Sequence, residues 1–397
     1  MGCFTVSGSE VSSSSVGRRG FLKIAVSAIV AGVVAGVGGY FAGSATVPPP
    51  KTVTETVTKT VATTITQTKT VTVTSTPKPT KPTKPTRKIL IAAGRTPDPW
   101  YPFAAALAKF INKKSDWLRA EAVSTAGVTA NTEVMREKPK EYIAIGCLSQ
   151  IHWLPGHPWG EARGTYTGGR FIANATSMTQ CFVTYNPDLK KVEDLAGKVV
   201  DVGRKGATNT IDHKAILEAY GILDKVKLVY TGYGGGAKKL RDGLVDTTML
   251  IFVHIYPHKF SKGSFIEQLE TKAPVYYIGF DRDILLELCE KEYATLPVRV
   301  PAGALGKTQP NELWAYNDAT FFWADESLEE DVVYEITRII WETPAEEWAK
   351  WHPMGAHMNE KFKPAVPLPK VFKPHPGARK FYEEHGIEIK NLADLLA

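Results

Sequence analysis

The feature that most constrains this chain is a long N-terminal stretch that cannot form a globular core. Residues 48–86 read PPPKTVTETVTKTVATTITQTKTVTVTSTPKPTKPTKPT and contain no aromatic residue. A segment with so little apolar mass cannot bury enough surface to offset the entropy of ordering. Its threonines and prolines are typical of an extended stalk, either O-glycosylated or bare. We therefore expect residues 47–87 to be a spacer and the fold to lie in residues 88–397.

The segment before the stalk has the pattern of a membrane anchor. No charged residue lies between Lys23 and Lys51, and about 20 apolar residues are enough to span a bilayer as a helix. Arg18-Arg19 precedes this run, and positive charge stays on the cytoplasmic side. We expect residues 1–23 in the cytoplasm, residues 24–46 as a signal or transmembrane anchor, and the rest outside the cell or in the periplasm.

The basic residues before the apolar run carry a second signal. Arg18-Arg19-Gly20-Phe21-Leu22-Lys23 resembles a twin-arginine motif, which exports cargo that is already folded. The alternative is an ordinary signal anchor with basic flanking residues. Gly43-Ser44-Ala45 also fits a small-residue cleavage site, so cleavage stays open, although we favour an uncleaved anchor.

The net charge of the chain belongs to this N-terminal part. The whole chain carries +7, and its first 87 residues contain 10 Lys and Arg against 2 Asp and Glu. The remaining residues are therefore close to neutral. Nucleic-acid binding needs a basic face on the folded part, so we expect no nucleic-acid partner.

The cysteines and histidines of residues 88–397 do not follow a metal-binding pattern. Cys147, Cys181 and Cys289 have no metal-ligand spacing, and Cys147 and Cys181 either form a bridge or, as we favour, are buried thiols. His254 and His258 are four residues apart, but Pro257 interrupts a helix there. We expect no metal and no cofactor. The histidines of the proline-rich connections read as structural: His352, His357 and His375.

Short apolar runs alternate with helix-period segments along the folded part. Strands are predicted over 88–93, 118–123, 142–148, 180–185, 198–203, 226–232, 247–255 and 274–280. Helices are predicted over 101–112, 129–136, 210–222, 235–246, 281–293 and 328–343. This alternation indicates an α/β fold with largely parallel sheets, in which ligands bind at the carboxyl ends of the strands.

Three loops at such strand ends have the composition of binding loops. They are residues 94–102, 124–131 and 203–209, and each places glycine and hydroxyl residues at or near the start of a helix. The free N–H groups and the dipole of a helix start favour an anion such as a carboxylate. Since Thr and Asn are also ordinary helix caps, each loop alone means little, but three together favour a site.

Several stretches, in the same order along the chain, resemble the TAXI family, the solute receptors of tripartite ATP-independent (TRAP) transporters. The similarity runs from about residue 89 to about residue 390. It rests on ILIAAGRTPDPWYPFAAALAKFIN, DLAGKVVDVGRKGATNT, YGGGAKKLRDGLVDTTMLI, VPAGALGKTQPNELWAYNDATFFWADESLEEDVVYEITRIIWE and, most specifically, LPKVFKPHPGARKFYEEHGI.

The resemblance implies an α/β, two-lobe periplasmic-binding-protein fold of type II with two crossing hinge strands, near 181–186 and 315–322. Lobe 1 would comprise residues 88–184 with 318–397, and lobe 2 residues 185–317. A small organic acid or amino acid, glutamate-like or a dicarboxylate, would bind in the cleft between them. The loaded receptor would then deliver it to TRAP-type membrane permease subunits, so the chain would not be an enzyme.

The resemblance also suggests which residues line the cleft. Arg95, Arg204 and Lys205 stand where the family has glycine-rich loops, and each either binds an anionic group or is an exposed, solubilising cation. The other candidates that the resemblance carries over come from the three loops: Thr96, Trp100, Tyr101, Thr129, Asn131, Ala207, Thr208 and Asn209. The stretch 149–166 fits the family least, but Ser149 and Gln150 follow the strand at 142–148, and His254 and Tyr256 follow the strand at 247–255, so their positions make them candidates as well. His152 follows the same strand as Ser149, and Trp153 and Trp159 either cover the cleft or pack a surface loop.

Three other classes of protein remain alternatives. A receptor for an ABC importer or a sensory receptor would have the same fold and cleft. A tethered cell-surface enzyme is disfavoured because the chain has no HExxH, GxSxG or paired-cysteine motif. A structural protein on a stalk is disfavoured by the varied, glycine-lined strand ends.

Overall fold

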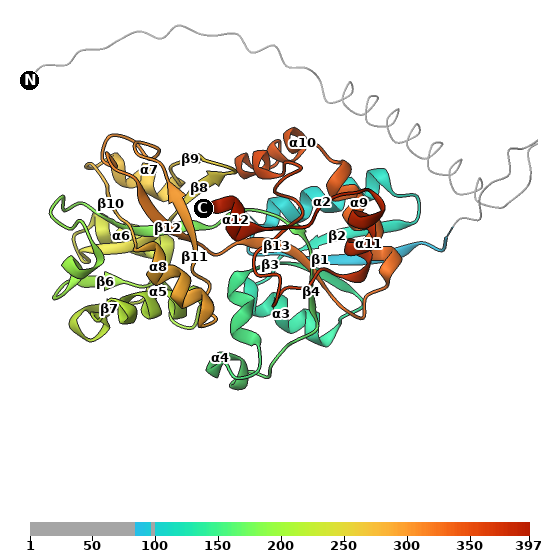
Figure 1. Cartoon of the computed structure of the whole chain (residues 1–397), viewed down its shortest axis with the longest axis horizontal. Helices are drawn as coiled ribbons and strands as arrows, with labels where there is room; N and C mark the ends of the chain where they lie inside the picture. The colour runs from blue at the N-terminus through green and yellow to red at the C-terminus, as the bar shows by residue number, and fades with distance from the viewer. Residues whose placement is uncertain (1–83, 97–99) are drawn as a thin grey trace, which may run out of the picture. The chain divides into compact units, whose positions relative to one another are not determined.

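The structure is a computed structural model that describes residues 84–96 and 100–397. The expected cytoplasmic segment, the anchor and nearly all of the stalk lie outside these residues. Within the described ranges no helix is both long enough and apolar enough to cross a membrane. Residues 83–397 form one compact unit, which contains two lobes, each built on its own β-sheet (Figure 1).

The first lobe contains a five-stranded sheet in the order β2-β1-β3-β13-β4. Its first three strands are parallel, and β13 runs antiparallel to both β3 and β4. The strands are β1 (Arg87–Ala92), β2 (Leu118–Val123), β3 (Tyr142–Cys147), β4 (Gly169–Asn174) and β13 (Thr320–Asp325). The helices are α2 (Trp100–Lys114), α3 (Val128–Glu137), η1 (Leu148–Trp153), α4 (Pro158–Glu161), α9 (Glu330–Glu342), α10 (Ala345–Ala349), η4 (Pro353–His357) and α11 (Pro376–Glu384).

The second lobe contains a sheet in the order β11-β12-β5-β8-β6-β7, with β10 paired to β5 and β9 to β8. Its parallel part is β7-β6-β8. The strands are β5 (Thr179–Thr184), β6 (Val199–Asp201), β7 (Lys227–Val229), β8 (Thr247–Ile255), β9 (Lys259–Ser261), β10 (Tyr276–Ile278), β11 (Leu296–Val300) and β12 (Leu313–Asn317). The helices are η2 (Val192–Leu195), α5 (Thr208–Ala219), η3 (Leu223–Lys225), α6 (Tyr233–Arg241), α7 (Ser264–Glu270) and α8 (Arg282–Glu290).

The chain passes between the two sheets twice, at residues 175–178 and 318–319. The two passages are bonded to each other, since the Asp318 backbone N–H donates to the Met178 carbonyl at 3.2 Å. The expected α/β two-lobe arrangement is therefore confirmed. The expected lobe boundary after residue 184 falls at the end of β5, which is hydrogen-bonded to β8 in the second sheet.

The chain does cross between the sheets near 315–322, as expected, but not as one continuous strand. The apolar run there is divided into β12 and β13, which belong to different sheets and are separated by Asp318 and Ala319. The other expected crossing strand, near 181–186, also differs, because β5 lies in the second sheet and the passage precedes it. The resemblance locates the crossings only approximately, and the polar residues Asn317 and Asp318 lie where the chain leaves one sheet for the other.

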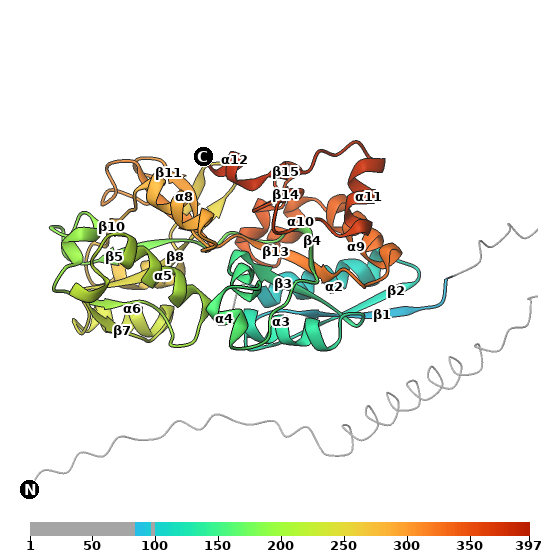
Figure 2. The ribbon, with the colours of Figure 1, turned by 60° about the horizontal axis from the view of Figure 1, so that its bottom comes forward.

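Apolar packing joins the lobes at the C-terminus of the chain. Leu392 and Leu396 of α12 (Leu392–Leu396) are buried in one cluster with Leu296 and Val298 of β11. The preceding β15 (Lys390–Asn391) pairs in parallel with β14 (Ala365–Val366). Figure 2 shows α12 beside β11, on the side of the molecule that also carries β14 and β15. The segment 390–396, which we call the C-terminal strap, thus holds part of lobe 2 to the rest of the chain.

The three histidines of the proline-rich connections have structural roles, as expected. Nδ1 of His352 accepts from the Met354 N–H at 3.2 Å, and Nδ1 of His375 accepts from the Gly377 N–H at 3.1 Å, so both cap short helix starts. His357 Nδ1 accepts from the Tyr256 N–H at 2.9 Å. The thiols of Cys147, Cys181 and Cys289 are free, so the alternative of a Cys147–Cys181 bridge is excluded.

Candidate site at the lobe junction

The carboxyl ends of the parallel strands in the two sheets meet at the junction between the lobes. After β3 the chain continues into the 3₁₀ helix η1, and after β6 it turns into α5. Ser149 of η1 and Thr208 of α5 share a hydrogen bond of 3.0 Å between their side-chain oxygens, and both residues are buried. The structure therefore brings together two of the predicted site residues from different lobes.

A second contact lies beside the first because of helix periodicity. A 3₁₀ helix repeats every three residues and an α-helix about every four, so His152 follows Ser149 on η1 and Asp212 follows Thr208 on α5. His152 Nε2 lies 3.2 Å from Asp212 Oδ1, and both side chains are fully buried. The His152 Nε2 atom makes no hydrogen bond in this contact. The contact is an ion pair only when the imidazole is protonated.

The Asp212 carboxylate is fixed from its own lobe. Its Oδ1 accepts a hydrogen bond of 2.8 Å from the backbone N–H of Ala294. His152 in turn stacks on His157 with 4.5 Å between ring centroids. Burial, and then the neighbouring His152, lower the pKa of His157. At neutral pH the junction therefore contains little positive charge from His157.

Asp318 lies at the return passage between the sheets and faces the same junction. Its Oδ1 accepts a hydrogen bond of 2.9 Å from the backbone N–H of Ser149. Burial raises the pKa of Asp318 to about 7, and repulsion from Asp212 adds to the shift. Near neutral pH this carboxyl is thus partly protonated, which a solvent-exposed aspartate would not be.

Amide and phenol groups form a further series of hydrogen bonds on the lobe 2 side. Asn209 Nδ2 donates to the Tyr233 hydroxyl at 2.8 Å, and this hydroxyl donates to Gln180 Oε1 at 3.0 Å. Burial, followed by repulsion from Asp318, raises the pKa of Tyr233. The Tyr233 hydroxyl is therefore a neutral donor, and the predicted residue Asn209 is tied to two residues that the sequence did not single out.

On the lobe 1 side, Asn131 and Gln150 bind mainly within their own lobe. Asn131 Nδ2 donates to the Ile145 carbonyl at 2.8 Å, so Asn131 holds α3 to β3. The Thr132 hydroxyl donates to Gln150 Oε1 at 2.7 Å, which leaves the Gln150 Nε2 without a partner. Gln150 can therefore still offer two N–H groups, whereas Asn131 has a structural role.

Several fully or almost fully buried polar atoms near the junction have no hydrogen-bond partner. Such atoms are rare because each costs free energy unless a partner satisfies it. They are Gln150 Nε2, both ring nitrogens of His152, Gln180 Nε2, Asp212 Oδ2, and both amide atoms of Asn317. The set contains donors suited to a carboxylate and acceptors suited to an N–H group, as expected of a site for a small polar molecule.

The remaining predicted residues of the three loops lie in different surroundings. Arg95, Thr96, Arg204 and Lys205 are exposed, whereas Thr129 and Ala207 are half-buried. Trp100 is buried in the hydrophobic core of lobe 1, and Tyr101 packs against that core. The first two loops are neighbours, since the Thr125 N–H donates to the Gly94 carbonyl at 3.3 Å.

His254 and Tyr256 belong to a separate contact between the lobes. His254 is fully buried and stacks on Phe260 with 4.3 Å between ring centroids, and its ring contacts that of His357. Tyr256 stacks on Phe362. These two predicted residues therefore pack against η4 and the residues that follow it, and not against Ser149 or Thr208. Among the described residues no group of three or more His, Cys, Asp or Glu side chains is placed to hold a metal ion.

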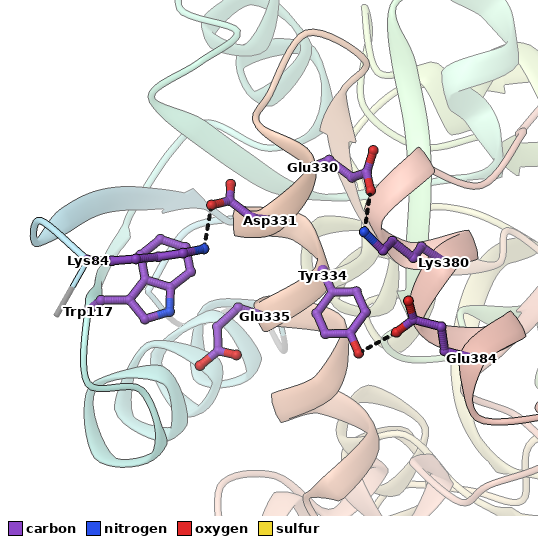
Figure 3. A pocket seen from close by; sticks show the side chains of 8 residues that line it. All are labelled: Lys84, Trp117, Glu330, Asp331, Tyr334, Glu335, Lys380 and Glu384. Carbon is purple, nitrogen blue, oxygen red and sulfur yellow. Dashed lines mark hydrogen bonds and ion pairs between the residues drawn. The ribbon is translucent and has the colours of Figure 1, made fainter. Parts of the chain in front are cut away.

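A pocket of about 620 Å³ on the surface of lobe 1 is a weaker candidate. Figure 3 shows most of its polar side chains already paired: Lys84 with Asp331 at 2.6 Å, Lys380 with Glu330 at 3.1 Å, and the Tyr334 hydroxyl with Glu384 at 2.8 Å. Exposed ion pairs of this kind contribute little energy. The pocket therefore offers no buried, unpaired group that would identify a ligand.

The sequence reasoning missed the acidic and amide part of the junction: Gln180, Asp212, Tyr233, Asn317 and Asp318. The helix predicted over 210–222 begins after Thr208, and only its extension back to Thr208, as in α5, places Asp212 four residues later on the same face. Asn317 and Asp318 lie inside the crossing strand that the resemblance implies near 315–322. Polar residues that interrupt such a run mark either a turn or a functional position.

Comparison with known proteins places the chain in a family. The model of the NMT1-like family matches residues 91–386, which is most of the folded part. The chain therefore belongs to the NMT1-like family.

Solved structures show a distant likeness. The periplasmic aliphatic sulphonate binding protein of Escherichia coli is 12% identical, with 79% of this chain and 98% of that chain covered and a TM-score of 0.41. MatC of Rhodopseudomonas palustris with bound malate is 14% identical, with 79% and 100% covered and a TM-score of 0.40. A TctC solute binding protein from Polaromonas is 12% identical, with 71% and 90% covered and a TM-score of 0.42. The ligands named for these proteins are not assigned to this chain by the likeness.

Proposed function

We propose that this chain is an extracytoplasmic solute-binding receptor that captures a small organic acid or amino acid between its lobes. The observation that carries the proposal is the lobe junction, where Ser149 and Thr208 meet and buried amide and carboxylate atoms have no partner. A structural interface usually satisfies most such atoms or replaces them with apolar groups. A site that opens to admit a polar solute leaves them for that solute.

The chemistry of the junction suits a molecule with a carboxylate. Thr208 is the first residue of α5, and a helix start offers free N–H groups and a favourable dipole. The unpartnered amide nitrogens of Gln150 and Gln180 add further donors. Closure of the two lobes around the passages at 175–178 and 318–319 would then bury the solute, as in hinge-bending binding proteins.

Delivery to a TRAP-type permease, as in the TAXI family, is the partner that the sequence resemblance favours. An N-terminal anchor at residues 24–46 and a stalk at 47–87 would hold the receptor near such a permease. Uptake by vesicles that carry the permease and the receptor tests this point. We expect uptake to depend on an ion gradient and not on ATP, and ATP-dependent uptake would favour an ABC importer.

Solute capture is tested by a screen of amino acids and small carboxylic acids against the full chain. We expect at least one compound to raise the melting temperature and to reduce the radius of gyration in X-ray scattering. Thr208→Trp, which fills the junction, should abolish both responses, whereas Thr271→Trp at an exposed position should keep them. Consumption of the bound compound would instead indicate an enzyme, and a screen without any response would contradict the proposal.

A further inference from the structure

Two buried carboxyl groups dominate the charge of the lobe junction. Asp212 comes from α5 and Asp318 from the return passage between the sheets, and each is at most 2% exposed. Asp212 has an ion-pair contact with His152. Among the described residues, no lysine or arginine forms an ion pair with either carboxyl group. The junction therefore holds two carboxyl groups, of which one faces an imidazole, and a buried charge without a partner is costly inside a protein.

The two carboxyl groups belong to one electrostatic cluster. Asp212 raises the pKa of Asp318 through their repulsion, next to the larger effect of burial. Tyr316 interacts with both of them, and burial is the main reason why its own pKa is raised. A compensating cation would relieve this repulsion, whereas a second anion placed there would increase it.

Two buried acceptors in or next to this pair of carboxyl groups have no hydrogen-bond donor. Asp212 Oδ2 has no partner, and neither has Asn317 Oδ1 in the residue next to Asp318. Both side chains are fully buried. Two acceptors that are buried without a donor each cost free energy. An ammonium group, which has three donors and a positive charge, would satisfy both the hydrogen bonding and the charge.

We propose that Asp212 and Asp318 form the subsite for a protonated amino group of the solute, so that the receptor selects amine-bearing solutes over acids with the same carbon skeleton. This inference rests on the proposed function, and it narrows the ligand from small organic acids in general to amine-bearing ones. In this arrangement the carboxylate of the solute faces the donors Gln150 and Gln180, and its amino group faces the two carboxyl groups.

The test compares matched pairs that differ only in the amino group: L-glutamate with glutarate, L-aspartate with succinate, and L-alanine with propionate. Affinities for the full chain are measured by isothermal titration calorimetry, after a broader thermal-shift screen of amino acids, amines and dicarboxylates. We expect the amine-bearing members to bind, with the deaminated members at least about 100-fold weaker, since a site built around a hydrogen-bonded group strongly rejects analogues that lack it.

Asp212→Asn tests the role of the carboxylate directly. Asparagine keeps an oxygen that can accept from the Ala294 N–H, so the fold should persist, and circular dichroism checks this. We expect the variant to reduce the preference for the amine-bearing member to less than about tenfold. Asp318→Asn should do the same, and Asp224→Asn, an exposed carboxyl of η3, should leave the preference unchanged.

The outcomes separate the inference from the proposed function. Binding of dicarboxylates as tightly as amino acids, with compaction of the lobes, would keep the receptor and overturn the amine subsite. An unchanged preference in both folded Asp→Asn variants would also overturn it. If no compound in either screen binds, the receptor function fails, and the subsite fails with it.

Discussion

Ser149 and Thr208, which lie on different lobes, share a buried hydrogen bond of 3.0 Å between their hydroxyl oxygens. This bond should favour the arrangement in which the lobes are in contact, because it joins one buried residue of each lobe. Neutral buried hydrogen bonds contribute roughly 0.5–1.5 kcal/mol to stability. The contact is therefore measurable as a coupling between two substitutions.

A double-mutant cycle should detect this coupling. We expect Ser149→Ala and Thr208→Val to show a coupling free energy of about 1 kcal/mol in urea unfolding of the full chain, since each alone removes the shared bond. Ser149→Ala combined with Thr271→Val, an exposed position, should be additive. A coupling indistinguishable from zero between Ser149 and Thr208 would mean that the lobes are apart in solution.

Asp318 should give the protein an unusual dependence on pH. Its pKa is about 7 in the folded state against an ordinary value of 3.8, because it is buried beside Asp212. Between these two values the folded state holds more protons than the unfolded state, so the contribution of Asp318 to stability decreases as pH rises from about 4 to 7. The slope from one such group is at most about 1.4 kcal/mol per pH unit.

Asp318→Asn should remove this dependence. The difference in unfolding free energy between variant and parent should grow in favour of the variant from pH 4 to pH 7 and then level off. Urea unfolding at several pH values measures it. Asp224→Asn provides the exposed control, and a difference for Asp318→Asn that stays constant across this range would contradict the assignment.

The C-terminal strap should hold the lobes together through apolar contacts. Leu392 is fully buried against β11, and truncation of a buried leucine to alanine costs about 2–5 kcal/mol. We expect Leu392→Ala to lower stability by that amount and to increase the radius of gyration. Leu244→Ala, at a leucine that is 60% exposed, should change neither. An unchanged radius of gyration with lower stability would mean that the strap supports packing but not closure.

Lys363 should stabilise the end of α9. Its Nζ is buried and donates to the Trp341 carbonyl at 2.9 Å and to the Thr343 carbonyl at 2.7 Å, where the helix leaves its last carbonyls without partners. Burial lowers its pKa to about 8. We expect Lys363→Met to cost roughly 2 kcal/mol in thermal or urea unfolding, because it leaves two buried carbonyls unsatisfied.

The sign of the change in unfolding free energy for Lys363→Met is informative, because burying the charge of Lys363 also costs free energy. If the desolvation of Lys363 outweighed its two hydrogen bonds, Lys363→Met would equal or exceed the parent in stability, and the capping role would be refuted. Lys350→Met, at an exposed lysine, removes the same charge outside the core and should have an effect within about 0.5 kcal/mol.

Most of the secondary structure could be predicted because it follows from local patterns. The strands β2 and β8 begin and end where the apolar runs do, and the amphipathic period of residues 328–343 identifies α9. The candidate site was only half predictable. Ser149, Thr208 and Asn209 follow strand ends, whose position at one edge of a sheet is a property of parallel topology.

The α/β class, the near-neutral charge of the folded part and the polar loops after the strands follow from the sequence alone, since these depend on composition and on local period. Only the tertiary structure decided that His152 meets Asp212, that Asp318 lies beside both and that α12 crosses to β11. These contacts join residues that are far apart in the chain. Which residues meet depends on how the two separate sheets face each other. No local pattern encodes that arrangement, because it depends on packing that each lobe acquires only when both are folded.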